Sequence, residues 1–518
     1  MNASRAEPHV RLVGRALLIG ACVGAAAAIG SAATCAAVGG AAVFADALLF
    51  ARRRALAVTI GLVVLAAAAS GPALASVGLR DALLAMGAAS LVVTAWRAPR
   101  AALLALVILA PVHTLVLSVI EGRWLLDPGA LGMWKDVLVG TLCARAIVSG
   151  GRAPALRRAD QPERWLAALV GLAMGVTVVS IARREVGIGL AARGLAADFG
   201  PLLLYPLARS LGDSGLDFAR VRRLVVWMGA GLAIFGFVQL VVLGPSWYGT
   251  VGYFGPRDFK VPGHEHFRLS SVFLDPLPAG LLLAVAALLA LDELGGLGAD
   301  ATSVWSAPAI RGLALFAVCA LGCVATFTRS AWLGLAVGAI GLARVHRGAS
   351  ARAIRVALIL AALATLPIVP SVLSWTRDTA TRAESDTSFP HHLDAWSRGV
   401  REIADHPSGL GPGRAGEVSV RVLGASGIVT ESSYLQFGVE YGVAGLLLVA
   451  GWTIALTLRL WRAARAGEPG AAGVLAAWAP LAIGALFLHA LTERSVAYPV
   501  LLLAGASQRS RDAAREAR

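Results

Sequence analysis

Three arginines and a glutamate in this sequence have side chains suited to binding phosphate and activating a hydroxyl group. Arg193, Arg268 and Arg329 each lie at the edge of an apolar run. A guanidinium group forms charge-assisted and often bidentate hydrogen bonds with phosphate oxygens, so the three together would suit a lipid pyrophosphate. Each arginine alone has a simpler interpretation, because long cationic side chains also extend towards lipid headgroups.

The glutamate, Glu431, comes just before the apolar run that begins at Tyr434. An acid at a helix N-terminus is stabilised by the helix dipole, which is a purely structural reason for its presence. A carboxylate near an acceptor hydroxyl can also take its proton. For that role we consider Glu431 first, followed by His392 or His391, and we predict Glu431 and His392 as the catalytic residues.

The longest stretch without a membrane-spanning pattern runs from Ser371 to Tyr441. Within it, Pro390–Asp405 predicts an amphipathic helix, because its apolar residues recur at helical spacing. His406-Pro407 ends this helix and a glycine-rich turn follows. The apolar face comprises Leu393, Trp396, Val400 and Ile403, and the polar face comprises His391, Asp394, Arg398, Arg401 and Asp405. An ordinary surface helix would explain the apolar face, whereas His391, Arg398 and Arg401 are candidate contacts to a substrate.

The remaining histidines and the cysteines do not point to a metal site. His264 and His266 flank Glu265, but two histidines this close still need a third ligand, so we favour a polar loop. His113 and His489 lie in or near apolar runs, and we interpret them as hydrogen-bonded histidines of a helix bundle. The five cysteines fall in apolar segments, so no disulfide framework is implied. We expect neither a metal nor another cofactor.

Composition places these residues in a membrane protein. The 518-residue chain is 57% hydrophobic and 15% charged, whereas soluble domains are about a quarter charged. Many apolar segments approach the roughly 20 residues with which a helix crosses a hydrocarbon core of about 30 Å. The long Ala, Leu, Val and Gly runs lack the alternation of a transmembrane barrel. We therefore predict an all-α polytopic membrane protein with about 12–16 transmembrane helices.

The apolar runs also predict how the chain is organised. We expect N-terminal helices in residues 1–192, central helices with the arginine segments in 193–370, a long external loop in 371–433, and C-terminal helices with a basic tail in 434–518. The predicted spans lie near residues 14–31, 33–51, 55–77, 81–96, 101–120, 129–148, 165–182, 194–211, 223–243, 277–292, 311–327, 330–344, 353–370, 434–460, 472–490 and 494–507.

The distribution of arginines predicts the topology. If the N-terminus is cytoplasmic and the spans alternate, nearly every basic cluster falls on the cytoplasmic side, as the positive-inside rule requires. Such clusters include residues 51–54, 150–164 and 458–467. Both termini are then cytoplasmic and residues 371–433 are external. The same distribution accounts for the net charge of +15 without nucleic-acid binding.

Segments in the second half of the chain resemble the O-antigen ligase and O-antigen polymerase superfamily of bacterial polysaccharide enzymes. They are, in order, RLSSVFLDPLPAG, TFTRSAWLGL, HHLDAWSRGVREIADHPSGLGPG and TESSYLQFGVEYGVAGLLL. The first is similar to the family's segment with Arg, Phe and Asn/Asp-Pro. The resemblance covers roughly Arg193 to Leu448, and its specificity comes from the order and spacing of the motifs.

The resemblance implies a membrane glycosyltransferase of the GT-C type. Such enzymes transfer glycan from undecaprenyl pyrophosphate at the external, periplasmic face of the bacterial inner membrane. Polymerases pass it to another lipid-linked repeat of O-antigen or exopolysaccharide, and ligases pass it to an acceptor such as the lipid A–core of lipopolysaccharide. The resemblance implies no metal or nucleotide, and it implies that arginines hold the pyrophosphate, here Arg193, Arg268 and Arg329. The partners would be the lipid-linked glycan donor, a glycan or lipid acceptor, and membrane lipids.

Two positions depart from the family pattern. Ligases usually carry a His-Asn-like pair before the final loop-side span, where this chain has Glu431 and Ser432. The long-loop helix often begins with an arginine four residues before its tryptophan, where this chain has His392 before Trp396. Both departures favour a polymerase, or a ligase with another acceptor.

Two other classes of protein stay open. A transporter or flippase for a lipid-linked or anionic lipid would place ionisable residues near the membrane midplane and often shows related halves. This chain instead concentrates charge at one face. A structural or assembly protein would leave the external arginines unexplained.

Overall fold

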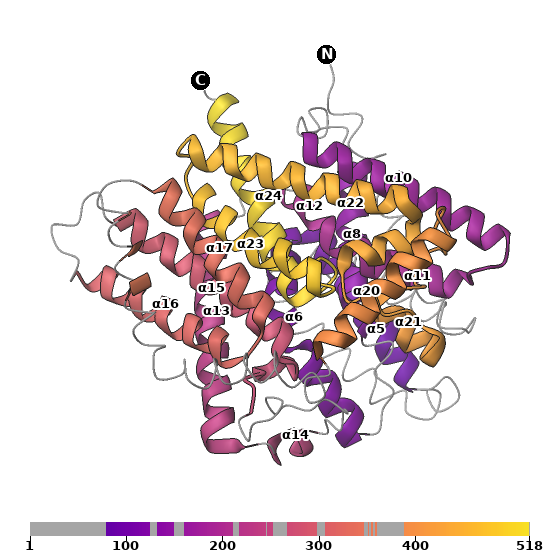
Figure 1. Ribbon diagram of the computed structural model, residues 1–518, viewed down its shortest axis with the longest axis horizontal. Coiled ribbons are helices and arrows are strands. Elements are labelled where there is room, and N and C mark those ends of the chain that lie inside the picture. The colour runs from indigo at the N-terminus through magenta and orange to yellow at the C-terminus, as the bar shows by residue number, and fades with distance from the viewer. Residues whose placement is uncertain are drawn as a thin grey trace, which may run out of the picture. The chain divides into compact units, whose positions relative to one another are not determined.

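The computed structural model describes residues 79–124, 132–149, 160–210, 217–244, 246–251, 267–297, 306–346, five positions between 351 and 359, and 388–516. The regular structure within these ranges is helical (Figure 1). One isolated bridge joins Ala415 and Ile428. The prediction of an all-α fold is confirmed.

The chain divides into two compact units. The smaller comprises Met1–Leu106 and Asp127–Ala153, and the larger comprises Val107–Leu126 and Pro154–Arg518. In the smaller unit, α5 (Leu79–Arg97) packs against α8 (Trp134–Ser149). Helix α6 (Pro99–Trp124) carries the chain from the smaller unit into the larger one.

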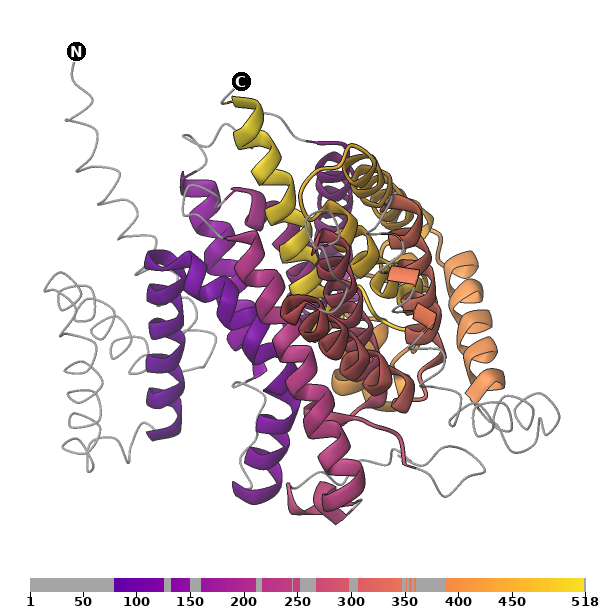
Figure 2. The same ribbon diagram turned by 90° about the vertical axis from the view of Figure 1, so that its left-hand side faces the viewer.

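The larger unit contains every residue that the sequence predicts to be functional. Its helices are α10 (Gln161–Ala182), α11 (Ile188–Leu202), α12 (Leu204–Ser210), α13 (Phe218–Val238), a π-helical turn (Gln239–Leu243), α14 (Ser246–Thr250), a 3-10 turn (Ser271–Phe273), α15 (Pro276–Leu297), α16 (Ala307–Ala325), α17 (Arg329–Val345), α20 (Ser388–Asp405), α21 (Gly416–Leu423), a 3-10 turn (Gly424–Ser426), α22 (Ser433–Arg465), α23 (Ala471–Phe487) and α24 (Arg494–Glu516). In Figure 2, α24 (yellow) and α13 (magenta) run beside each other through this unit.

Helix α15 forms the centre of the larger unit. It packs against α13, α16, α17 and α23, and its apolar side chains from Leu281 to Leu291 are almost fully inaccessible. Such all-round burial requires a helix that is apolar on every face, as its sequence is. Small residues let the surrounding helices approach closely. A Cβ atom added to Gly334 on α17 would lie 2.5 Å from the Cα atom of Pro480 on α23.

Six helices of the described residues are long and apolar enough to cross a membrane, which makes the chain a multi-pass membrane protein. They are Pro99–Ile120, Gln161–Ala182, Phe218–Leu243, Pro276–Leu294, Ala307–Ala325 and Ser433–Arg465. Helix α23 is apolar but shorter. The predicted spans 14–31, 33–51 and 55–77 and most of 353–370 lie outside the described residues.

The prediction of a single span over residues 194–211 is wrong. Helix α11 ends at Leu202, and α12 begins at Leu204. Pro206 lacks the N–H group that would bond to the carbonyl of Leu202, and its ring would clash with that carbonyl in a continuous helix. The chain therefore breaks between the two helices.

Helix α22 contains a second break, which shapes the functional end of the molecule. Gly442 has φ +73° and ψ −171°, so α22 is two helical pieces joined at this residue. A left-handed φ is accessible to glycine at little cost. The carbonyls freed by the break accept hydrogen bonds from the loop that follows α20, with Leu410 N–H bonding to Val439 O and Gly411 N–H bonding to Glu440 O, each at 2.9 Å.

Candidate active site

The start of α20 faces the residue that precedes α22. His391 Nε2 lies 3.4 Å from Glu431 Oε1, and His392 Nδ1 forms an ion pair with Glu431 Oε2. Their positions are about forty residues apart in sequence, and the pairing closes the end of the loop onto the membrane body. The structure thus brings both predicted catalytic residues, and His391 with them, into one cluster.

The backbone of Glu431 is strained. Its φ of +47° is in the left-handed region, which costs a residue with a Cβ atom about 1–2 kcal/mol. Its neighbours hold it there. Trp396 Nε1 donates a long hydrogen bond of 3.5 Å to the Glu431 carbonyl oxygen, and Ser432 is the N-cap of α22 and accepts from the N–H of Leu435. Backbone strain that is held in place by surrounding contacts occurs most often at functional sites.

The turn at Glu431 is also tied to the connection between α23 and α24. Ser432 Oγ donates to the carbonyl of Ala485 at 3.2 Å, and Ser433 Oγ donates to the carbonyl of Leu488 at 3.2 Å. Ser433 Oγ in turn accepts from the N–H of Leu491 at 3.1 Å. The Glu431 carboxylate is therefore presented by a turn that three helices fix.

Helix α20 packs on this turn through its small and aromatic residues. The Trp396 ring stacks on Phe487 with centroids 5.7 Å apart and an interplanar angle of 28°, a contact worth about 1 kcal/mol beyond area burial. A Cβ atom at Gly399 would lie 3.2 Å from Thr430 Cγ2, so the two segments are in close contact. Of the predicted apolar face, Trp396 and Ile403 are turned inward whereas Leu393 and Val400 are exposed, because Ala395 and Gly399 take the closest approach.

The electrostatics of the cluster keep Glu431 ionised. Burial alone would raise its pKa, but the interaction with His392 and the charges of His391 and His489 outweigh burial, so the pKa of Glu431 lies below its ordinary value. The ion pair places His392 Nδ1 against Glu431 Oε2, so a proton held between these two atoms would leave Nε2 as the ring nitrogen without a proton. A carboxylate that fixes the tautomer of a histidine in this way is a common arrangement in proton transfer.

His489 is a member of this site that the sequence analysis misjudged. Among the described residues neither of its ring nitrogens has a hydrogen-bond partner, although both are buried, so its interpretation as a hydrogen-bonded bundle histidine is wrong. Burial lowers the pKa of His489, and the nearby Glu417 and Glu431 carboxylates oppose that shift. His489 follows the end of α23, and its electrostatic interaction with Glu431 relates it to the loop histidines.

Of the three predicted phosphate-binding arginines, Arg268 is largely engaged with the protein. Its Nε donates to the carbonyl of Thr326 at 2.9 Å, and its Nη2 lies 3.4 Å from the Phe327 carbonyl and from Thr328 Oγ1. These atoms form the turn that leads directly into Arg329. Arg268 therefore supports the turn between α16 and α17.

Arg329 and Arg193 lie on two different helices. Arg329 is exposed at the first position of α17, and the turn that Arg268 supports places it. Arg193 is exposed on α11, and its neighbour Gly194 lies against Gly413 of the glycine-rich turn. The structure brings Arg268 and Arg329 together, whereas it places Arg193 beside the loop.

The two arginines of α20 are exposed. Arg398 lies seven residues after His391 and so continues the same helical stripe two turns further on. Arg401 is exposed, with its Nη2 3.4 Å from Ser397 Oγ. Both side chains are therefore accessible to a ligand that approaches along α20.

Sequence analysis missed a buried polar group beneath the loop. Asp198 on α11 is buried and accepts from Gln436 Nε2 at 2.7 Å and from the Tyr441 hydroxyl at 2.6 Å. Glu440 is also buried and accepts the N–H of Ala415 at 2.9 Å. The signal was present in the sequence, because Gln436 and Glu440 are four residues apart within an apolar run, where polar side chains need partners.

No part of the described chain gathers three or more His, Cys, Asp or Glu side chains in an arrangement suited to a metal ion. The predicted alternative of a ligand pair at His264 and His266 lies outside the described residues.

The comparison with known protein families covers most of this site. Residues 314–450 match a family model described as O-antigen ligase. The matched range is 137 of the 518 residues, and over this range the chain is similar to O-antigen ligases. This confirms the resemblance to the O-antigen ligase and polymerase superfamily that the sequence motifs indicate. The search of curated proteins found no match.

The matched range contains Arg329, both loop histidines and Glu431, together with the buried Glu440. It begins after Arg268 and Arg193 and ends before His489. Three candidate residues therefore lie outside the matched range, and only the sequence and the structure support them.

Proposed function

We propose that this protein is a membrane glycosyltransferase that transfers a glycan from undecaprenyl pyrophosphate to an acceptor hydroxyl at the external face of the bacterial inner membrane. The observation that carries the proposal is the cluster of Glu431 with His391 and His392, set in the range that is similar to O-antigen ligases. The cluster lies at one end of the helix bundle, where a lipid-linked sugar and a water-exposed acceptor can meet.

The reaction requires one bond to form and one to break. The acceptor oxygen attacks the anomeric carbon of the donor sugar, and the bond from that carbon to the pyrophosphate oxygen breaks. Undecaprenyl pyrophosphate leaves with the bonding electrons. The hydroxyl proton passes to a base, so the protein has to supply a base beside the acceptor and positive charge beside the leaving group.

The Glu431–His392 pair supplies the base in this proposal. His392 receives the hydroxyl proton on Nε2, and Glu431, paired with Nδ1, orients the ring and stabilises the imidazolium ion that forms. The fixed turn at Glu431 keeps the pair in position before the substrate binds. Such preorganisation contributes to rate because no rearrangement is needed at the moment of reaction.

The arginines supply the positive charge. Arg329 is the exposed cation at the start of α17, and Arg268, which holds the turn before it, would bind the same pyrophosphate. Arg193 would reach the same ligand from the side of α11. Arg398, Arg401 and His391 would contact the glycan along α20.

The acceptor is proposed only as a class of molecule. A second lipid-linked repeat would make the protein a polymerase, and a different envelope acceptor would make it a ligase. The position where ligases usually carry histidine is Glu431 here, and the imidazole is supplied instead by His392 of α20. Because the imidazole comes from α20 and not from the position before α22, we favour an acceptor other than lipid A–core.

The test is genetic and chemical. The gene is deleted in the source organism and replaced with Glu431→Gln, His392→Gln or Arg329→Ala, with Asp405→Asn as a matched control on the exposed end of α20. Surface glycan is separated on a gel, and the lipid carrier fraction is analysed in parallel. A polymerase defect leaves single repeats, and a ligase defect leaves full-length chains on the carrier.

Wild-type glycan from the Glu431→Gln and His392→Gln strains, at normal protein levels in the membrane fraction, would disprove the proposed site. Loss of glycan in the Asp405→Asn strain would show that any change in the loop abolishes activity, and the losses in the other strains would then not identify the site. A reporter-fusion map that placed residues 371–433 in the cytoplasm would contradict the proposed location of the reaction.

A further inference from the structure

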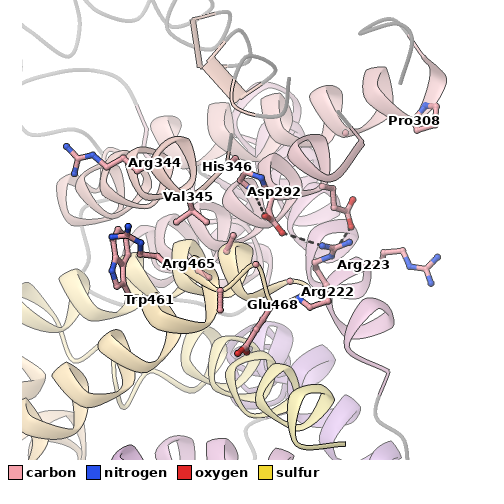
Figure 3. A pocket seen from close by; sticks show the side chains of 18 of the residues that line it. Arg222, Arg223, Asp292, Pro308, Arg344, Val345, His346, Trp461, Arg465 and Glu468 are labelled. Atoms are coloured by element: carbon pink, nitrogen blue, oxygen red, sulfur yellow. Dashed lines mark hydrogen bonds and ion pairs between the residues drawn. The ribbon is translucent and has the colours of Figure 1, made fainter. Parts of the chain in front are cut away.

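A large cavity lies at the end of α22 remote from Glu431. Its volume is about 1050 Å³, and we call it the basic cavity (Figure 3). Six helices contribute to it: the C-terminal parts of α15, α17 and α22 and the N-terminal parts of α13, α16 and α23. Five arginines and three acids line it, namely Arg222, Arg223, Arg311, Arg344, Arg465, Asp292, Glu293 and Glu468.

The floor of the basic cavity is electrostatically balanced. Asp292 is buried and pairs with His346 Nε2 at 2.9 Å and with Arg222 Nη1 at 3.4 Å. Arg222 Nε lies 3.3 Å from Glu293 Oε1. Figure 3 shows Asp292 between His346 and Arg222. Two of the three acids are thus compensated by Arg222 and His346 within the floor.

The rim differs from the floor, because its arginines are exposed and, in the described part of the chain, are not paired with acids. Arg311, Arg344 and Arg465 are exposed, and within the described ranges none of them forms an ion pair. Arg465 lies over the Trp461 ring, 5.8 Å from its centroid, and Figure 3 shows these two beside Arg344. An indole at the boundary of an apolar bundle is typical of the membrane interface.

From this arrangement we propose that the basic cavity binds the phosphodiester of an anionic lipid headgroup. Guanidinium groups pair with phosphate oxygens, and basic pockets between transmembrane helices on the cytoplasmic side are suited to such headgroups. The cavity lies at the end that carries the arginine-rich loops, which the positive-inside rule assigns to the cytoplasm. Trp461 beside Arg465 favours a lipid over a soluble phosphate, because the indole would rest against the glycerol and upper acyl chains.

This site is separate from the proposed glycosyl transfer. Glu431 lies just before α22, and Arg465 is the last residue of that helix. The piece of α22 after the break at Gly442 runs from residue 443 to 465. At about 1.5 Å per residue this piece alone is roughly 34 Å long, which is the thickness of a bilayer core. The lipid would therefore be held in the opposite leaflet from the donor.

The experiment measures binding to the full-length protein purified in a zwitterionic detergent. Short-chain phosphatidylglycerol is titrated, with phosphatidylcholine of the same chain length as the neutral comparison, and bound lipid is counted by native mass spectrometry. The variants are Arg344→Gln, Arg465→Gln and the double change. Arg462→Gln is the matched control, an exposed arginine on the same helix that does not line the cavity.

We expect phosphatidylglycerol to bind the wild type and the Arg462→Gln control alike. Each single cavity variant should bind it about fivefold more weakly, and the double variant about 25-fold, since one arginine near an anionic lipid is worth roughly 1 kcal/mol. Both sites are exposed, so a thermal unfolding curve without lipid should be unchanged and confirms folding. Equal binding of phosphatidylcholine would overturn the proposal. Equal loss in Arg462→Gln would overturn it too, and so would displacement of the lipid by an equal concentration of inorganic phosphate, which would indicate a soluble ligand.

Discussion

Glu431 and Glu440 are nine residues apart around the start of α22, yet their surroundings differ in almost every respect. Glu431 is partly exposed, has a strained backbone and faces two histidines of α20. Glu440 is fully buried, lies within the helix and is bonded through Oε1 to the N–H of Ala415. Its other oxygen, Oε2, is buried without a hydrogen-bond partner among the described residues.

The difference separates an acid that can take part in chemistry from one that holds a loop in place. Glu431 lies beside imidazoles and is partly exposed, so a substrate can reach it, whereas Glu440 is enclosed by the bundle and bonds to the backbone of the loop. Both acids lie within residues 314–450, the range that is similar to O-antigen ligases. Position within that range therefore does not by itself say which acid reacts.

The largest effect should come from neutralising each acid in turn. Glu431→Gln should lower the rate of glycan transfer about 10²–10⁴-fold, because the base loses the group that orients and charges it. Glu440→Gln should stay within about threefold of the wild type, since the amide keeps the oxygen that accepts from Ala415. The measurement is release of undecaprenyl pyrophosphate from a lipid-linked donor by the purified protein.

Equal rates for the two variants would break the distinction between the acids. The matched His391→Gln change tests it further, because His391 is the more distant partner at 3.4 Å and should matter less than His392. A His391 variant as inactive as Glu431→Gln would move the base to the other histidine.

A smaller effect should follow from removing a donor below the loop. Tyr441→Phe deletes the hydroxyl that bonds Asp198 Oδ2 at 2.6 Å, leaving a buried acceptor unpaired at a cost of about 1–3 kcal/mol. We expect a lower unfolding temperature in detergent, with transfer activity retained at low temperature. Tyr434→Phe, which removes a hydroxyl 3.4 Å from the Ala482 carbonyl, is the control and should shift the temperature less.

The smallest effect concerns pH. The pKa of His489 is lowered from 6.5 by burial, so the unfolded chain takes up a proton there before the folded protein does. That group's contribution to stability is complete above about pH 6.5 and is lost as the pH falls towards the lower folded-state pKa. His489→Gln should flatten the fall in unfolding temperature below pH 6.5. An unchanged slope would mean that His489 is solvated and does not face Glu431.

The fold could be predicted to the extent that hydrophobicity and helix signals are local. The amphipathic helix expected at Pro390–Asp405 is present as Ser388–Asp405, because its apolar spacing and the His406-Pro407 stop are written in adjacent residues. Helix α21 and the break at Gly442 were not foreseen. Both depend on tertiary hydrogen bonds, such as Gly416 N–H to Ile428 O at 2.9 Å, which no local pattern reveals.

The candidate site could be predicted in part for the same reason. Glu431, His391 and His392 were identified by residue type and position, and the structure places them in contact. The hydrogen bonds of Arg268 to the Thr326–Thr328 turn could not be predicted from the sequence, because they join residues 58 to 60 positions apart. The place of His489 in the site was not predicted, because an apolar run does not show that a histidine is buried without hydrogen-bond partners.

The break at Gly442 has a consequence for protein engineering. Gly409 and Gly411 have left-handed backbones, and the N–H groups of Leu410 and Gly411 bond to carbonyls next to the break, while Val443 N–H bonds back to Pro407 O at 3.1 Å. The loop and the first nine residues of α22 are thus one interlocked piece. A chimera that exchanges this loop between relatives would need its junctions before α20 and after Gly442. A junction at Ser433 would separate the loop from the residues of α22 to which it is hydrogen-bonded.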